Sequence, residues 1–237
     1  MYFRNERNQE RAYSRNKGVE LAKNEFIFFL DCDDLWKEDY IENSLPYLQE
    51  GYHIVYSIPR DFVDDEGRHI RRSQKPVPLE PAQAIFNSLV GYPSATALRK
   101  SSFLGYKHEY LMREDWELFI RYYLAGLKIK LLDNSKVLIR EHTGRTSRNI
   151  RFMKATVKVY EDYKELIPKE YLPDFTMHTA LTCMRFGALF KGWSLWFRAV
   201  YQKPSLLSNP RNFLYALKWG FRFERFFKSI LPTRERL

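Results

Sequence analysis

Residues 25–34 read EFIFFLDCDD, a short and almost wholly apolar run that stops at a cluster of carboxylates. A run of this length and composition is typical of a buried strand in a sheet that is covered on both faces. Helical spacing of apolar residues precedes it over residues 9–23, and residues 39–49 and 54–58 predict a second helix and a second strand. This alternation of helices and strands predicts an α/β fold.

The pattern continues to about residue 150 and then changes. We expect a hairpin turn at residues 64–67, strands at 94–98, 127–132 and 137–139, and a helix over 115–125 that Gly126 ends. From Phe152 onward the spacing is helical, with breaks at Pro168, Pro173, Pro204 and Pro210. The sequence therefore predicts an α/β domain over residues 1–150 and a helical region, basic and aromatic, over 151–237.

The net charge of +10 is concentrated in that second region. Residues 176–237 contain 11 Lys/Arg and 2 Asp/Glu, so the basic character belongs to the C-terminal part of the chain. Cys32 and Cys183 are far apart and predict no disulfide framework, which favours a reducing compartment. No apolar stretch approaches the roughly 18 residues that cross a bilayer, so any membrane role would be peripheral.

The acidic cluster at residues 31–34 has two interpretations. Carboxylates suit hard divalent cations such as Mg²⁺ or Mn²⁺, and ligands of open α/β sheets bind beyond the carboxyl ends of strands. The alternative is an acidic turn in which Asp33 or Asp34 caps a helix. The apolar strand directly before the cluster favours the metal interpretation.

Two further segments contain candidate site residues. Glu114 and Asp115 open the predicted helix. One interpretation is that the helix dipole stabilises these carboxylates. The other is that one of them is a general base that faces a cleft. A basic loop follows the last predicted strand. Within it, His142 is a candidate metal ligand, and Arg145 and Arg148 are candidate phosphate ligands.

Taken in order, these segments resemble family 2 glycosyltransferases. The resemblance covers about the first 150 residues and rests on five stretches: RAYSRNKG at 11–18, FIFFLDCDDLW at 26–36, PSATALRK at 93–100, EDWELFIR at 114–121 and HTGRTSRN at 142–149. Each motif is weak alone, but their common order and spacing make the set specific.

The resemblance implies a GT-A fold, which is a Rossmann-type sheet, and a nucleotide-sugar donor with a saccharide or lipid-linked acceptor. It implies a Mg²⁺ or Mn²⁺ ion. The roles it implies are as follows: metal ligands Asp31, Asp33 and His142; donor-binding residues Arg15, Asp31, Asp33, Asp34 and Arg145; base Asp115, with Glu114 as its rival; acceptor-binding residue Trp116. Members of the family take part in cell-surface polysaccharide or glycolipid synthesis.

The start of the chain departs from the family pattern. Such enzymes begin with a strand, a helix and a strand that bind the nucleotide base, whereas here the first predicted helix starts almost at Met1. About 60 to 70 residues, roughly two βα units, would be missing. We therefore expect a GT-A-like sheet that lacks its first βα units, followed by a helical appendage.

The C-terminal region predicts a membrane contact. A helix over residues 211–231 would place Lys218, Arg222 and Arg225 on one stripe, with the apolar residues Phe223, Phe227 and Ile230 opposite. Basic amphipathic helices with aromatic residues suit an anionic membrane surface, which predicts a cytoplasmic protein held at the inner face of the membrane. The alternative is a helical lid with a solvated basic face. We expect no nucleic-acid partner, because no recognition motif is present.

Two other functions compete with sugar transfer. In a haloacid-dehalogenase-like phosphatase, Asp31 would be the nucleophile and Asp33 the acid, but Leu35 stands where that family usually has a small hydroxyl residue. The other is a non-catalytic transferase remnant that binds a membrane or a partner chain.

Overall fold

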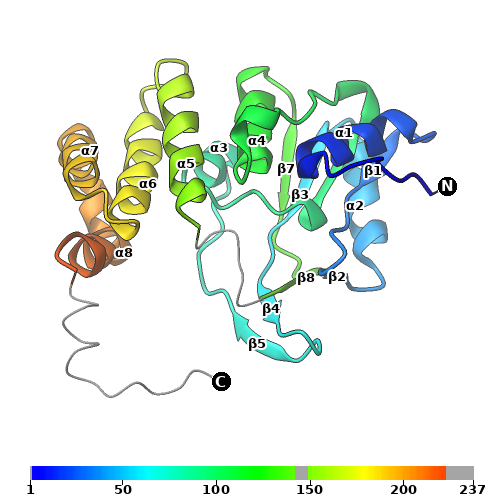
Figure 1. Ribbon diagram of the computed structural model, residues 1–237, viewed down its shortest axis with the longest axis horizontal. Coiled ribbons are helices and arrows are strands. Elements are labelled where there is room, and N and C mark those ends of the chain that lie inside the picture. Colours follow the sequence, from blue (N-terminus) through cyan, green and yellow to red (C-terminus); the bar gives the residue numbers. More distant parts are fainter. Residues whose placement is uncertain (1, 142–148, 223–237) are drawn as a thin grey trace. The chain divides into compact units, whose positions relative to one another are not determined.

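The computed structural model describes residues 2–141 and 149–222 of the 237-residue chain. The chain divides into two compact units, Met1–Ala155 and Thr156–Leu237, and the boundary falls inside helix α5 (Ile150–Tyr163). The first unit is a mixed α/β structure and the second is helical over its described residues (Figure 1). The predicted α/β class with a helical C-terminal region is confirmed.

The first unit is built on a four-stranded sheet with the order β1 (Phe26–Phe28), β6 (Thr96–Arg99), β3 (Ile54–Ser57), β7 (Ile129–Leu132). Strand β6 is antiparallel to both of its neighbours, and β3 is parallel to β7. Side chains alternate across β3. Val55 packs with Leu48 of α2 (Tyr40–Gln49), whereas the ring of Tyr56 lies 5.3 Å from that of Phe119 in α4 (Glu114–Leu124). Helices α2 and α4 therefore cover opposite faces.

Strand β1 differs from its prediction. It has three residues rather than six, it lies at an edge of the sheet, and its residues are half-buried. The reason is its position: β6 is its only strand neighbour in the described part of the chain, so the second edge of β1 is not covered by another strand. An apolar run predicts a strand but not its place in the sheet.

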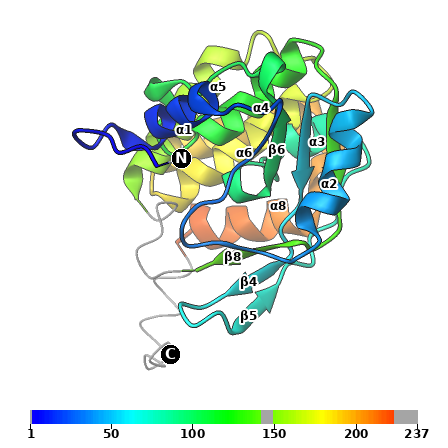
Figure 2. The same ribbon diagram turned by 90° about the vertical axis from the view of Figure 1, so that its right-hand side faces the viewer.

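A second sheet has the order β2 (Leu35–Trp36), β8 (Val137–Arg140), β4 (Asp61–Val63), β5 (His69–Arg72). Strands β4 and β5 form the predicted hairpin, in which Gly67 has a positive φ of 82°. Figure 2 shows β8, β4 and β5 side by side. Helix α1 (Glu10–Leu21) precedes both sheets in the chain, and the short α3 (Pro81–Phe86) follows β5.

The second unit contains α6 (Leu172–Arg185), α7 (Leu189–Gln202), a 3₁₀ turn at Pro204–Ser208 and α8 (Pro210–Tyr215). Helices α6 and α7 lie side by side (Figure 1), and a Cβ on Gly192 would come within 2.6 Å of Met184 Cγ. The predicted break lies just before Pro173, between Tyr163 and Leu172, because Pro173 stands in the first turn of α6, where the missing N–H has no helical partner to lose. None of the helices in the described ranges combines the length and hydropathy that spanning a bilayer requires.

The predicted continuous helix over residues 211–231 is also wrong in its described part. Helix α8 ends at Tyr215, a π-helical turn follows at Ala216–Gly220, and Arg222 has a φ of 56°. Gly220 packs directly on the indole of Trp193, where a Cβ would lie 2.4 Å from a ring carbon. The chain therefore turns at this contact, and Lys218 and Arg222 do not share a stripe of one α-helix. Arg225, Phe223, Phe227 and Ile230 lie outside the described residues.

Candidate active site

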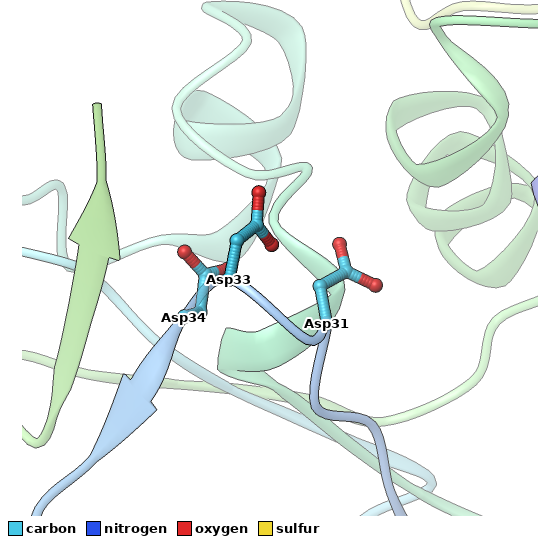
Figure 3. A group of neighbouring side chains, drawn as sticks. All are labelled: Asp31, Asp33 and Asp34. Carbon is cyan, nitrogen blue, oxygen red and sulfur yellow. The ribbon is translucent and has the colours of Figure 1, made fainter. Parts of the chain in front are cut away.

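The acidic residues of the DCDD segment form a loop between β1 and β2. Carboxylate oxygens of Asp31, Asp33 and Asp34 lie within 4.8 Å of one another. In Figure 3 the side chains of Asp31 and Asp33 extend to the same side of the loop. Oxygen ligands that gather at this spacing fit a hard divalent cation such as Mg²⁺ or Mn²⁺.

Asp34 shapes this loop. Its Oδ2 accepts a hydrogen bond from Ser94 Oγ at 2.6 Å, and its Oδ1 accepts one from the Arg140 N–H at 3.0 Å. The same Ser94 oxygen accepts a bond from the Asp31 N–H at 3.0 Å. Burial raises the pKa of Asp34, although these two hydrogen bonds oppose the shift. Asp34 thus ties the loop to β8 and to Ser94, and Asp31 and Asp33 are the carboxylates better placed to receive a ligand.

Arg15 of α1 joins this loop to the start of α4. Its Nη2 donates to both oxygens of Asp31, at 3.0 and 3.1 Å, and its Nη1 donates to both oxygens of Asp115, at 3.2 and 3.3 Å. Only 8% of Arg15 is exposed. Burial alone would lower the pKa of Arg15, but the charges of Asp115 and Asp31 raise it above its ordinary value. Arg15 is therefore a buried cation that holds two acidic segments in one site.

Arg15 is itself held in place by Asn16 on its own helix and by Tyr106, which lies in the segment after β6. Its guanidinium lies 5.6 Å from the ring centroid of Tyr106. The side chain of Asn16 fixes the backbone of Tyr106 from both sides, because its Nδ2 donates to the Tyr106 carbonyl at 2.8 Å and its Oδ1 accepts from the Tyr106 N–H at 2.7 Å. The predicted helix residues Arg15 and Asn16 thus act together.

Glu114 and Asp115 have different surroundings. Glu114 is fully buried; its Oε1 pairs with Arg11 at 3.3 Å and Arg15 at 3.5 Å, and its Oε2 accepts no hydrogen bond in the described part of the chain. The side chain of Asp115 is 14% exposed. Burial raises the pKa of Asp115 to about 7, with Arg15 opposing the shift and Glu114 adding to it. A carboxylate with this pKa and some access to solvent can exchange a proton near neutral pH.

Trp116 does not fit the acceptor-binding role that the sequence suggests. The side chain is almost fully buried, its indole N–H donates to the Ile85 carbonyl at 2.6 Å, and the Arg113 guanidinium lies 4.3 Å from its ring centroid. No face of the indole is left for a sugar. Trp116, Phe119 and Ile120 repeat at helical spacing and are all buried, so Trp116 belongs to the core side of α4.

The structure brings Arg15, Asp31, Glu114 and Asp115 together, with Asp33 and Asp34 on the same loop as Asp31. His142, Arg145 and Arg148 lie outside the described residues, so their predicted roles stay predictions. Sequence reasoning missed Ser94 and Tyr106 as parts of the site. Ser94 stands in the PSATALRK stretch, but a serine beside a strand has no pattern that predicts a bond to a loop 60 residues earlier.

Comparisons with known proteins indicate the family of this chain. Residues 1–113 match the model of the family described as Glycosyl transferase family 2. An uncharacterized glycosyltransferase of Methanocaldococcus jannaschii is 26% identical over 138 residues, which cover 56% of this chain and 48% of that protein. The amylovoran biosynthesis glycosyltransferase AmsB of Erwinia amylovora is 26% identical over 137 residues, or 51% of this chain and 44% of that protein.

A third relative is named for its reaction. The UDP-Glc:alpha-D-GlcNAc-diphosphoundecaprenol beta-1,3-glucosyltransferase WfaP of Escherichia coli is 25% identical over 146 residues, which cover 58% of this chain and 54% of that protein. The chain spans about half the length of these three relatives. The family match over the acidic loop, together with these relatives, supports a family 2 glycosyltransferase.

Proposed function

We propose that this chain transfers a sugar from a nucleotide-sugar donor to a hydroxyl of a saccharide or lipid-linked acceptor, with a bound divalent metal ion. The observation that carries the proposal is the Arg15 bridge. It places the acidic loop, which suits the donor end of the reaction, beside Asp115, which suits proton removal from the acceptor. Sugar transfer needs these two kinds of carboxylate in one site.

The residues of the acidic loop fit Mg²⁺ or Mn²⁺. Asp31 and Asp33 offer carboxylate oxygens, and Asp34 keeps the loop in shape through Ser94 and Arg140. A divalent cation at this loop would neutralise the negative charge of the departing nucleotide diphosphate. Asp31 also accepts the paired bonds of Arg15, so a second cation there would share a carboxylate that Arg15 already orients.

Asp115 is the proposed base. Its pKa of about 7 leaves it able to accept a proton at neutral pH, and its side chain is more exposed than that of Glu114. Arg15 holds the carboxylate through both oxygens and so fixes its orientation. Glu114 is fully buried between two arginines, and the role that fits this position is to hold Arg15 rather than to contact the acceptor.

The substrate class is proposed from the relatives. AmsB is named for amylovoran biosynthesis, and the name of WfaP gives a UDP-glucose donor and a diphosphoundecaprenol-linked acceptor. We extend only the class to this chain: a nucleotide-sugar donor and a saccharide or lipid-linked acceptor, in the synthesis of a cell-surface polysaccharide or glycolipid. A cytoplasmic location at the inner face of the membrane would bring the chain to such an acceptor.

A single set of variants tests the proposal. We would measure binding of UDP and GDP with and without Mn²⁺, and transfer from a panel of nucleotide sugars to polyprenyl-diphosphate-linked sugars. Asp115→Asn should keep Mn²⁺-dependent nucleotide binding but lose transfer by roughly 10² to 10⁴-fold, the usual contribution of a general base. Asp33→Asn should lose the Mn²⁺ dependence of binding instead.

The matched control is Asp162→Asn, which removes an exposed carboxylate that pairs with Lys158. It should change neither measurement. Normal transfer in Asp115→Asn with a dead Glu114→Gln would reassign the base to Glu114. Nucleotide binding by the wild type with no transfer to any acceptor would favour a non-catalytic remnant.

A further inference from the structure

Helix α7 of the second unit has two apolar faces. One is buried: Gly192, Leu195, Trp196 and Ala199 point inward, and Gly192 allows close contact with α6. The other is exposed, because Phe190, Phe197 and Tyr201 are 92%, 60% and 89% accessible. Spacings of seven and four residues place these three rings on one side of the helix. A helix that packs only by its inner face normally has polar residues on the outside.

The exposed aromatic surface extends beyond α7. Trp193 lies 5.7 Å from Phe197 and 5.1 Å from Phe221, measured between ring centroids, and Phe221 is itself 60% exposed. Phe197, Trp193 and Phe221 are therefore contiguous. We call the set Phe190, Trp193, Phe197, Tyr201 and Phe221 the aromatic face. Large exposed apolar surfaces mark contact sites for a protein or a membrane.

The segment of chain that bears the aromatic face contains charges of one sign. Residues 176–222 contain seven Lys/Arg and no Asp or Glu. Lys191 and Lys203 pair with carboxylates from earlier in the chain, Glu161 and Asp174. Among the described residues, no carboxylate pairs with Arg198, Arg211 and Lys218, which are exposed, or with Arg222, which is partly buried.

We propose that the aromatic face and these four cations form a docking surface for an anionic lipid bilayer. Aromatic rings with apolar bodies partition into the headgroup region, and lysine and arginine beside them attract anionic lipids. The total lack of acidic residues over 176–222 favours a negatively charged partner. Lipid accounts for this combination better than an acidic protein or nucleic acid does, because aromatic rings beside lysine and arginine suit the headgroup region of a bilayer. The surface lies on α7, on α8 and on the turn at residues 216–222, not on one long C-terminal helix.

The test uses the whole chain and vesicles of phosphatidylcholine with 30% phosphatidylglycerol, with pure phosphatidylcholine for comparison. Wild-type protein should sediment with the anionic vesicles, and binding should weaken as salt rises. Phe190→Ser with Phe197→Ser and Tyr201→Ser should lower the partition constant at least tenfold. Arg198→Gln with Lys218→Gln should lower it by about fivefold for each charge, which is about 1 kcal/mol per basic residue near the surface.

The substituted side chains are exposed, so the variants should keep the wild-type circular dichroism and melting temperature. The control is Leu79→Ser with Leu166→Ser, which removes two exposed apolar side chains, 100% and 61% accessible, outside the aromatic face and should leave vesicle binding unchanged. Vesicle binding that survives the triple aromatic change overturns the proposal. Binding to a DNA oligonucleotide or to polyglutamate that is as tight as, or tighter than, binding to the anionic vesicles also overturns it. The same holds if the protein does not bind vesicles but self-associates, and the triple aromatic change abolishes that self-association. The sedimentation assay contains no nucleotide-sugar donor and measures no sugar transfer, so its result is independent of the proposed function.

Discussion

Arg15 in the first unit and Arg198 in the second have opposite surroundings. Arg15 is buried and contacts three carboxylates, those of Asp31, Glu114 and Asp115. Arg198 is exposed on α7, in a stretch of 47 residues, 176–222, that contains no acidic residue at all. The same side chain therefore organises a site in one unit and faces outward in the other. The difference is in the placement of carboxylates. Where carboxylates lie nearby, an arginine forms ion pairs inside the protein; where none does, its charge can contact an external partner.

The contrast extends to the other arginines of the first unit. Arg60 pairs with Asp133, Arg72 with Asp61 and Arg121 with Glu117. The positive charges there are largely balanced by neighbours, so most of the excess charge of the chain lies in the second unit. The following predictions test this contrast, from the largest expected effect to the smallest.

Arg15→Ala should destabilise the first unit most. It leaves buried carboxylates without their cation, and removing one partner of a buried ion pair typically costs about 3 to 5 kcal/mol. Urea unfolding, with hydrogen exchange of amides in α1 and α4, measures the loss. Arg15→Lys should retain part of the stability, since it keeps the charge but not the paired hydrogen bonds. A loss below about 1 kcal/mol in Arg15→Ala would show that the three carboxylates do not depend on Arg15.

Asp115→Asn should raise the stability of the metal-free chain more at pH 8 than at pH 5. The pKa of Asp115 is about 7 in the folded state against an ordinary value of 3.8, so the folded state holds its proton more tightly. The stability that this carboxyl contributes is complete below pH 3.8 and is lost as pH rises toward 7. We expect the difference between variant and wild type to grow by about 1 to 3 kcal/mol between pH 5 and pH 8. A difference that is constant or shrinks with pH contradicts the raised pKa.

Ser94→Ala should have a smaller effect, on the order of 1 to 2 kcal/mol, because the buried bonds to the Asp31 N–H and to Asp34 are lost. It should also weaken Mn²⁺ binding, since the acidic loop loses its anchor. Calorimetry with Mn²⁺ alone checks the second point. Ser102→Ala is the matched control: its hydroxyl makes a bond to the Arg99 carbonyl away from the loop, so Mn²⁺ binding should not change.

Arg198→Ala should have the smallest effect on folding, within about 0.5 kcal/mol of the wild type in urea unfolding. The reason is that no carboxylate of the described residues pairs with it and its side chain is exposed. This result would complete the contrast with Arg15→Ala. A loss above about 1 kcal/mol would instead mean that Arg198 has a structural role inside the second unit.

The sequence by itself determined the local elements. Helical spacing predicted α1, α2 and α4, Gly126 ends α4 with a φ of 68°, and the Asp-rich turn before Gly67 predicted the β4–β5 hairpin. Each of these depends on neighbours within a few residues, so a linear pattern contains the necessary information. The acidic loop after an apolar strand was readable for the same reason, and so was the charge of residues 176–237.

Tertiary structure alone decided which distant residues meet. Arg15 reaches Asp31 and Asp115, which are 16 and 100 positions away, and no periodicity connects them. The edge position of β1, the burial of Trp116 and the turn at Gly220 also depend on partners far along the chain. These outcomes follow from packing and from pairing buried charges across elements. Such long-range contacts select one arrangement among many that the same local pattern permits.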